Sequence, residues 1–180
     1  MRKFLLPLVL GFIIVMAILS AYRQDDKPLP EKLERAMRLT QMNEYCDDDY
    51  DYTLRYPNFF EQTDDSLMDK GCCRFSFWLD SMEIVQNAFV EPNPDSLSVE
   101  QAMKKYASDL HATEEIKGDG YFILSGSLHT DSGQIADRRY HAKFVQHRKL
   151  WFVQSLTYTE DCEQAVTRLL QEIDKWKVWE

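Results

Sequence analysis

The chain has 180 residues, of which 44% are apolar, 13% aromatic and 28% charged. This balance excludes collagen-like, low-complexity and fully disordered proteins, and the length fits one domain with an additional segment. A formal charge of −9 argues against a nucleic-acid-binding protein, because such proteins present a basic face to the phosphate groups.

Residues 1–22 have the pattern of an export signal. Arg2 and Lys3 precede an uncharged apolar stretch at 4–21, and its length of about 18 residues is near the minimum for a span, roughly 17–25 residues. Leu19 is a large residue where a cleavage site prefers a small one, so we expect an uncleaved anchor, with a cleaved signal peptide as the alternative. The basic start predicts a single pass through a bacterial inner membrane with the C-terminal domain in the periplasm. Cleavage would instead release that domain into the periplasm.

Residues 23–48 are predicted to be a linker followed by a helix. The linker is polar and ends at Pro30, which suits the first position of a helix. Apolar residues then recur at helical spacing from Glu31 to about Tyr45. The acidic run Asp47–Asp51 departs from an EF-hand, so we interpret it as a solvated loop and not as a Ca²⁺ site.

Residues 49–180 are predicted to form one α+β domain. Alternation of apolar and polar residues predicts strands, and turn signals such as Gly118-Asp119-Gly120 join them into hairpins. The predicted strands are 52–60, 72–79, 82–90, 113–117, 121–128, 139–146 and 150–158. Ser98 and Gln101 have the spacing of a capping box, which predicts the start of a helix. A second amphipathic helix is predicted from 160 to 176, with Thr159 as its N-cap.

This order of elements resembles the PsbP-like fold, which is named after an extrinsic subunit of photosystem II. The resemblance covers roughly Asp49 to Lys177 and depends on Tyr56-Pro57, Phe59-Phe60, the helix in mid-chain, the segment Tyr121–Gly126 and the final antiparallel pair and helix. It implies an antiparallel β-sheet flanked by helices in an α/β/α sandwich, here preceded by an N-terminal hydrophobic helix. It also implies action by binding or scaffolding, since members of this family commonly lack an active site. The stretch Thr157–Glu160 departs from the Tyr-Pro that relatives often have before the last helix.

Four cysteines, all outside the apolar segment, carry the most specific chemistry of the sequence. An even number of cysteines in an oxidising compartment suggests disulfides. Adjacent strand residues point to opposite faces, which disfavours a bond between Cys72 and Cys73. Cys73 shares a face with apolar neighbours, and Cys162 lies on the apolar face of the last helix. We therefore expect the pairs Cys73–Cys162 and Cys46–Cys72, with one bond or none as the alternatives.

Other candidate sites are weaker. His129 and His141 are able to face each other across a hairpin and bind a metal, but two ligands are too few, and ordinary surface histidines are the favoured interpretation. Ser125 lacks the Gly-x-Ser-x-Gly elbow of a nucleophile and is interpreted as a strand residue. Trp176 and Trp179 either anchor a partner or fold back onto the core. We expect no catalytic residue, no metal and no cofactor.

The sequence therefore predicts an exported or membrane-anchored envelope protein that binds or scaffolds. We expect a protein partner in the cell envelope, no nucleic acid, and contact with the membrane through the N-terminal segment. Two alternatives stay open. The first is an enzyme with dispersed catalytic residues in a cleft between sheet and helices, and the second is an immunity or chaperone-like protein that binds one protein partner.

Overall fold

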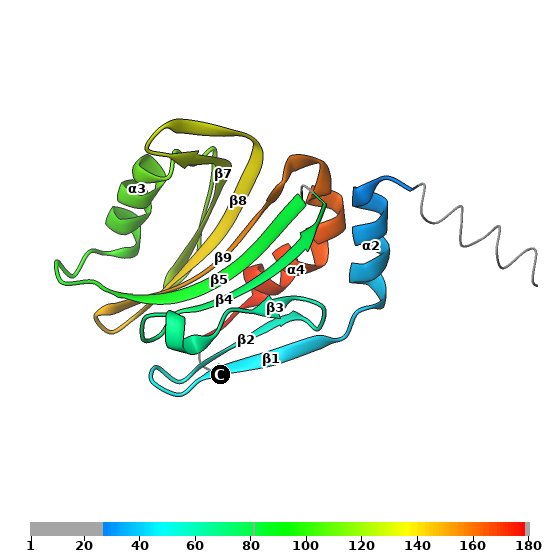
Figure 1. Cartoon of the computed structure of the whole chain (residues 1–180). Helices are drawn as coiled ribbons and strands as arrows, with labels where there is room; N and C mark the ends of the chain where they lie inside the picture. Colours follow the sequence, from blue (N-terminus) through cyan, green and yellow to red (C-terminus); the bar gives the residue numbers. More distant parts are fainter. Residues whose placement is uncertain (1–26, 81, 179–180) are drawn as a thin grey trace, which may run out of the picture.

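A computed structural model describes residues 27–80 and 82–178. Seven antiparallel strands form one sheet in the order β3-β4-β5-β9-β8-β7-β6 (Figure 1). The strands of this sheet are β3 (Glu61–Gln62), β4 (Cys73–Leu79), β5 (Met82–Pro92), β6 (Glu114–Lys117), β7 (Tyr121–Thr130), β8 (Gly133–His147) and β9 (Leu150–Thr159). The expected hydrophobic helix at the start of the chain lies outside the described residues.

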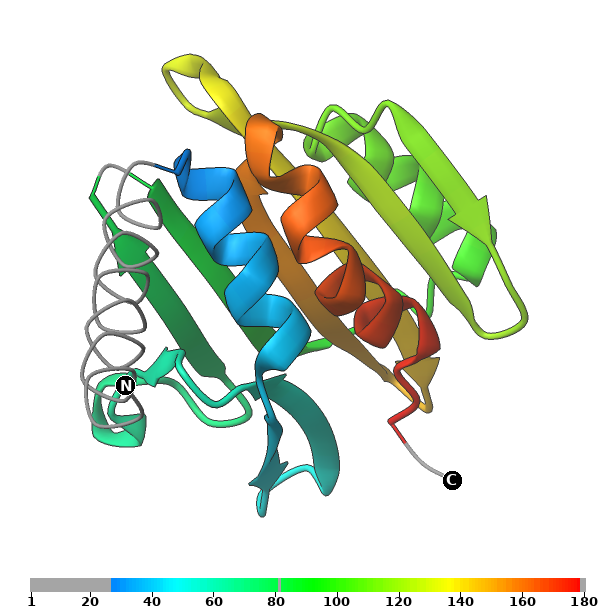
Figure 2. The same cartoon turned by 90° about the vertical axis from the view of Figure 1, so that its right-hand side faces the viewer.

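Helices cover both faces of the sheet, as the resemblance implied. The helices are α2 (Leu29–Leu39), α3 (Val99–Asp109) and α4 (Glu163–Lys175), with short 3₁₀ turns η1 (Asp65–Leu67) and η2 (Glu160–Cys162). Helix α3 packs on one face, while α2 and α4 lie side by side on the other (Figures 1 and 2). Arg168 of α4 donates to the carbonyl oxygens of Met37 and Thr40 at 3.1 and 3.0 Å, so it satisfies the C-terminal end of α2 and joins the two helices.

The alternation of side chains in the central strands explains the two cores. On β9, Phe152, Leu156 and Tyr158 face α2 and α4, whereas Trp151 and Val153 face α3. Successive strand residues point to opposite faces, so a strand covered on both sides buries both sets. Strand β9 lies between β5 and β8, and none of its ten residues is exposed.

The prediction of a helix from Glu31 to about Tyr45 is wrong in its second half. Helix α2 ends at Leu39, and Thr40 adopts an extended conformation that starts β1 (Met42–Asp47). Strand β1 pairs with β2 (Tyr52–Pro57) in a separate two-stranded hairpin. The hairpin is held by packing between elements, because the Tyr45 ring lies edge-on to Phe75 of β4 at 5.6 Å. Helical spacing of a few apolar residues cannot reveal such a tertiary contact.

The acidic run after β1 is the turn of this hairpin. Asp47 is buried, and its Oδ1 accepts a hydrogen bond from the backbone N–H of Tyr50 at 2.8 Å. The residues Asp48, Asp49 and Asp51 are exposed, so most of the run is solvated, as predicted.

Two local predictions on the α3 face are confirmed. Ser98 and Gln101 form a complete capping box at the start of α3. The turn at Gly118–Gly120 joins β6 to β7, and Gly120 adopts a positive φ of 74°, which glycine tolerates. Strand β8 begins six residues before the predicted start at Arg139, because it continues to pair with β7 beyond a register shift between Ser127 and His129.

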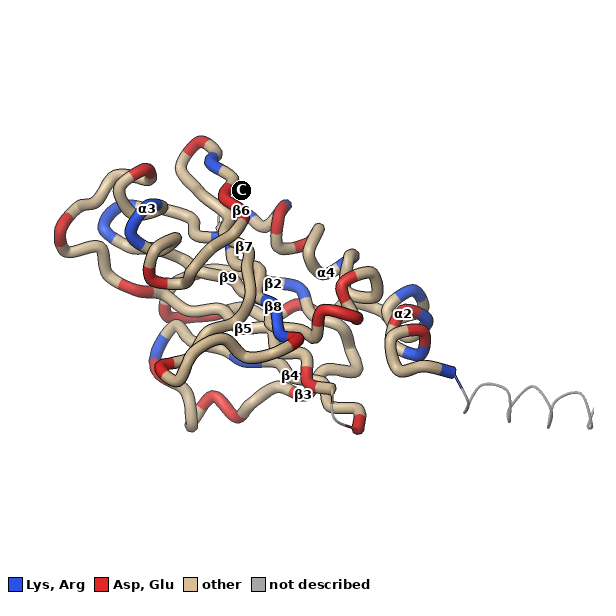
Figure 3. Tube along the Cα trace, turned by 90° about the horizontal axis from the view of Figure 1, so that it is seen from above, with Lys and Arg blue, Asp and Glu red and all other residues tan. Residues whose placement is uncertain are grey.

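Charged residues of both signs are distributed over helices α2, α3 and α4 and the turns, while the central strands carry few (Figure 3). Arg138 and Arg139 lie in the middle of β8, whereas Arg148 and Lys149 lie in the turn after its last residue, so the two pairs are about 30 Å apart along the strand and do not form one patch. Arg139 instead lies within 3.9 Å of three carboxylates, those of Glu114, Glu160 and Glu163.

Candidate functional site

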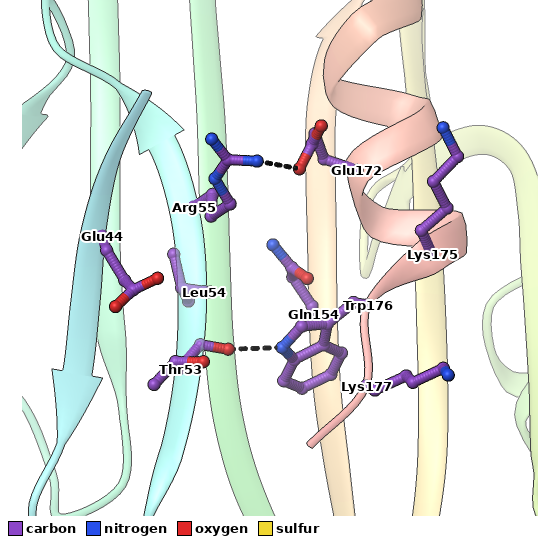
Figure 4. A pocket seen from close by; sticks show the side chains of 9 residues that line it. All are labelled: Glu44, Thr53, Leu54, Arg55, Gln154, Glu172, Lys175, Trp176 and Lys177. Carbon is purple, nitrogen blue, oxygen red and sulfur yellow. Dashed lines mark hydrogen bonds and ion pairs between the residues drawn. The ribbon is translucent and has the colours of Figure 1, made fainter. Parts of the chain in front are cut away.

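A polar cleft lies between the β1–β2 hairpin and the C-terminal end of α4, with β9 as its floor (Figure 4). Its volume is about 280 Å³. We call it the hairpin cleft. It is lined by Glu44, Thr53, Leu54, Arg55, Gln154, Glu172, Lys175, Trp176 and Lys177.

The floor of the hairpin cleft presents an amide with an unused acceptor. Gln154 is only 1% exposed, and its Oε1 has no hydrogen-bond partner among the described residues. On the neighbouring strand β5, the Gln86 Nε2 donates to the carbonyl oxygen of Arg55 at 2.9 Å, and the Gln86 Oε1 is also unpaired. An unsatisfied buried acceptor costs about 1–3 kcal/mol, so this floor favours an occupant that donates hydrogen bonds.

Two contacts join the walls of the cleft. The indole Nε1 of Trp176 donates to the carbonyl oxygen of Thr53 at 2.6 Å, and Arg55 lies 3.4 Å from the carboxylate of Glu172 (Figure 4). Trp176 is buried among the core residues, so it folds back onto the domain, which is one of the two expected outcomes. Trp179 lies outside the described residues.

A buried cation on β8, Lys143, binds the C-terminal end of α4. The Lys143 Nζ donates to the carbonyl oxygens of Asp174 and Trp176 at 2.6 and 2.8 Å, and it lies 4.4 Å from the centre of the Tyr121 ring. A positive charge is favourable at the C-terminal end of a helix, where carbonyl groups lack partners. Burial lowers the pKa of Lys143, and the nearby Asp174 carboxylate opposes that shift.

A serine, a histidine and an aspartate form a hydrogen-bonded chain beside this lysine. The Ser125 Oγ lies 2.8 Å from the His141 Nδ1, and the His141 Nε2 lies 2.8 Å from the Asp174 Oδ1. Ser125 and His141 are paired in register on β7 and β8, and Asp174 comes from α4. No sequence pattern pointed to this group of three residues, because Asp174 lies 33 positions from His141 and Ser125 was interpreted only as a strand residue.

The environment of the hydrogen-bonded residues Ser125, His141 and Asp174 is unsuited to nucleophilic catalysis. Ser125 is buried in β7 and is not among the residues that line the hairpin cleft. An acyl-transfer site needs N–H donors directed at a developing oxyanion. Here the nearest helix terminus is the carbonyl end of α4, and its cation, Lys143, is already bound to two carbonyl oxygens. The three residues therefore tie β7, β8 and α4 together.

Comparison with solved structures identifies the architecture. The solution structure of cyanobacterial PsbP (CyanoP) from Synechocystis sp. PCC 6803 superposes with a TM-score of 0.55, over 78% of this chain and 94% of that one. The chain has a PsbP-like fold. Sequence identity to CyanoP is 16%, so the likeness concerns the fold alone. No protein-family model and no curated protein matches the sequence.

The four cysteines of this PsbP-like domain are free thiols, so the expected pairs are not present in the structure. The pairing Cys73–Cys162 is incompatible with the fold. Cys73 lies opposite Ala88 of β5, whereas the Cys162 Sγ lies 3.0 Å from the Met82 Sδ. Six strand residues separate Ala88 from Met82, about 20 Å, and a disulfide needs Cα atoms closer than about 7 Å. Both residues face the same core, as predicted, but at its opposite ends.

Cys73 is buried in β4, Cys72 directly before that strand is half-buried, and Cys46 lies on the exposed side of its strand. The Cys73 Sγ lies 3.6 Å from the Tyr52 hydroxyl inside the core. Burial raises the pKa of the Cys73 thiol to about 12. Burial also raises the pKa of Cys162. These two buried thiols have the properties of small core residues rather than of reactive nucleophiles.

The histidine pair considered for a metal does not form. His141 faces α4 and contacts Asp174, while the His129 ring packs against His111, which follows α3 on the other face of the sheet, at a centroid distance of 4.5 Å. In the part of the chain that the structure describes, no three His, Cys, Asp or Glu residues are close enough to hold a metal ion.

The predicted export segment at residues 1–22 lies outside the described residues. Among the helices within 27–80 and 82–178, none has the length and apolar character of a membrane span.

Proposed function

We propose that this protein is a non-enzymatic binding domain that engages one protein partner through the hairpin cleft. The observation that carries the proposal is the buried Gln154 on the floor of the cleft, whose Oε1 has no hydrogen-bond partner among the described residues. A glutamine amide has one acceptor and two donors, so it matches the hydrogen-bonding groups of a peptide backbone. An extended segment of a partner protein would satisfy it.

The side chains on the walls of the hairpin cleft indicate which kind of partner segment it would bind. Trp176 supplies a flat apolar surface, and Lys175 and Lys177 are exposed on the same side of the cleft. Opposite charges across an interface favour correct docking and faster association. The partner segment is therefore extended, with acidic side chains directed at these two lysines.

We place this binding domain on the outer side of a bacterial inner membrane, anchored by the apolar segment at 4–21. The support is the sequence pattern of two basic residues before an uncharged stretch. Membrane fractionation, combined with protease added to spheroplasts, tests this location. The domain should be digested from outside and should sediment with membranes. A chain that is protected from protease and remains in the cytosol would exclude the location.

Photocrosslinking in cells tests the partner. A photoreactive residue in place of Lys177 should crosslink to one protein, whereas the same residue in place of Lys104, which is exposed on α3, should not. Adding Gln154→Leu should reduce the Lys177 crosslink at least fivefold without loss of stability, because the substitution removes an unpaired buried amide. Equal crosslinks at the two positions, or a Lys177 crosslink that Gln154→Leu leaves unchanged, would reject the hairpin cleft as the binding site.

A further inference from the structure

A second cleft, of about 260 Å³, lies on the opposite face of the sheet beside the C-terminal end of α3. We call it the α3 cleft. It is lined by Asn87, Phe89, Asp109, Leu110, Leu128, His129, Tyr140, Ala142, Phe144, Val153, Ser155 and Thr157. Strands β5, β9 and β8 make its floor, while α3 and the end of β7 make its walls.

The floor changes from apolar to polar along the strands. The strand register defines three rows of neighbouring side chains across the sheet. The rows are Phe89-Val153-Phe144, then Asn87-Ser155-Ala142, then Val85-Thr157-Tyr140. A ligand in the cleft therefore meets only apolar groups at one end and amide and hydroxyl groups at the other. This arrangement, mostly apolar with a few convergent polar groups, is typical of small-molecule sites.

Irregular backbone shapes the wall formed by β7. The pairing of β7 with β8 shifts register between Ser127 and His129, which leaves Leu128 without a partner residue. Such bulges redirect side chains, and both Leu128 and His129 line the cleft. Gly126 lies opposite Tyr140, and a Cβ at Gly126 would approach the Tyr140 ring to 3.3 Å and the His111 carbonyl oxygen to 3.1 Å. Because Gly126 has no side chain, the Tyr140 ring is able to lie on the floor of the cleft.

Tyr140 contributes an unused hydrogen-bonding group. The residue is 6% exposed, and its hydroxyl has no partner among the described residues. Buried tyrosine hydroxyls are usually hydrogen-bonded, so an unpaired one next to a cavity is informative. Burial, and to a lesser degree the nearby Glu115, raises the pKa of Tyr140 to about 12. The hydroxyl is therefore protonated at neutral pH and available as a donor.

The charges around the cleft disfavour an anion. None of its lining residues is a lysine or an arginine, and the single carboxylate, Asp109, forms an ion pair with Lys105 at 2.9 Å. The cleft also lies at the carbonyl end of α3, which carries a partial negative charge. A buried anion without a cation would pay a desolvation cost that nothing here offsets.

From these observations we propose that the α3 cleft binds a small neutral molecule that is apolar at one end and carries a hydrogen-bond acceptor, such as a carbonyl oxygen, at the other. The apolar end lies on the row of Phe89, Val153 and Phe144, and the acceptor receives hydrogen bonds from the hydroxyls of Tyr140 and Thr157. The site is independent of the hairpin cleft, because the two lie on opposite faces of the sheet.

Two neutral fluorescent probes of similar shape test the polar end of the site. Prodan, a propionyl naphthalene, has a carbonyl acceptor, whereas N-phenylnaphthylamine has none. Tyr140→Phe should weaken prodan binding about 2- to 12-fold and leave N-phenylnaphthylamine unchanged, as loss of one hydrogen bond predicts. Tyr56→Phe, on the other face of the sheet, is the matched control and should change neither. Equal effects of Tyr140→Phe on both probes, or no effect on prodan, would overturn the proposal.

Two further measurements test where the probes bind and whether the α3 cleft accepts a charged ligand. Ser155→Leu fills the middle row from a half-buried position and should lower the affinity of both probes at least tenfold. In competition with prodan, neutral acetylnaphthalene should displace the probe and anionic naphthoate should not. Unchanged binding of both probes to a folded Ser155→Leu variant would place them elsewhere. Displacement by naphthoate as strong as by acetylnaphthalene would reject the neutral ligand class.

Discussion

The indole Nε1 of Trp176 lies 2.6 Å from the carbonyl oxygen of Thr53 and joins the end of the last helix to the β1–β2 hairpin. These residues are 123 positions apart, and the contact closes one end of the hairpin cleft. The Trp176 ring also lies edge-on to Tyr52, at 6.2 Å between centroids. The tryptophan therefore supports both the core and the shape of the candidate site.

Trp176→Phe removes the donor and part of the buried ring, so it should lower the free energy of unfolding by about 1–3 kcal/mol. Urea denaturation followed by circular dichroism measures the change. Trp78→Phe is the matched control, because Trp78 is 61% exposed on β4, and it should stay within about 0.5 kcal/mol of the parent. Equal stabilities of the two variants would mean that Trp176 does not hold the hairpin.

Lys143→Met should destabilise the domain by about 1–3 kcal/mol. The methionine fills a similar volume but leaves the carbonyl oxygens of Asp174 and Trp176 without their donor. Lys104→Met, on the exposed face of α3, is the control and should have an effect below about 0.5 kcal/mol. Thermal or urea denaturation measures both. A Lys143→Met variant as stable as the control would show that water satisfies the helix end.

Local signals predicted most of the sheet. Period-two alternation located β4, a turn between two apolar runs located β9, glycines located the β6–β7 turn, and the pair Ser98 and Gln101 located α3. Each of these features depends on residues close together in sequence, which is why a single sequence reveals them. The segment Met42–Asp47 was misassigned because its strand is held by the Tyr45–Phe75 contact, which no local pattern encodes.

The candidate sites were less predictable for a related reason. Gln154 is an ordinary polar residue in a strand pattern, and only the packing of α4 and the hairpin around it makes it a cleft floor. The predicted pairing of Cys73 with Cys162 was wrong for the same reason, because it depends on tertiary packing. Strand alternation placed Cys73, and helical spacing placed Cys162, on the side of the core that contains both, but the position of each along that core depends on where α4 docks.

The thiols should differ strongly in reactivity. Cys46 is exposed and should react with N-ethylmaleimide within minutes at neutral pH, whereas Cys73 and Cys162 are buried and should react only through unfolding. Mass spectrometry of peptides from the folded, unreduced protein gives the extent of modification at each site. Moderate urea should accelerate modification of the two buried cysteines together. A peptide linked by Cys73 and Cys162 would contradict the arrangement of α4 on the sheet.

The buried thiol of Cys73 should make the domain sensitive to alkali. Its pKa is about 12 in the folded protein and 9.0 when unperturbed, so between these values the unfolded chain loses a proton that the folded chain keeps. The stabilising effect is complete below pH 9 and is lost as the pH rises toward 12, with a slope of up to about 1.4 kcal/mol per pH unit. Urea denaturation at pH 8, 9, 10 and 11 should therefore give a steeper fall for the parent than for Cys73→Ala. The variant starts from a lower stability because it leaves a cavity beside Tyr52, but its slope is the decisive quantity. Parallel pH profiles would show that Cys73 ionises as easily in the folded protein as in the unfolded chain.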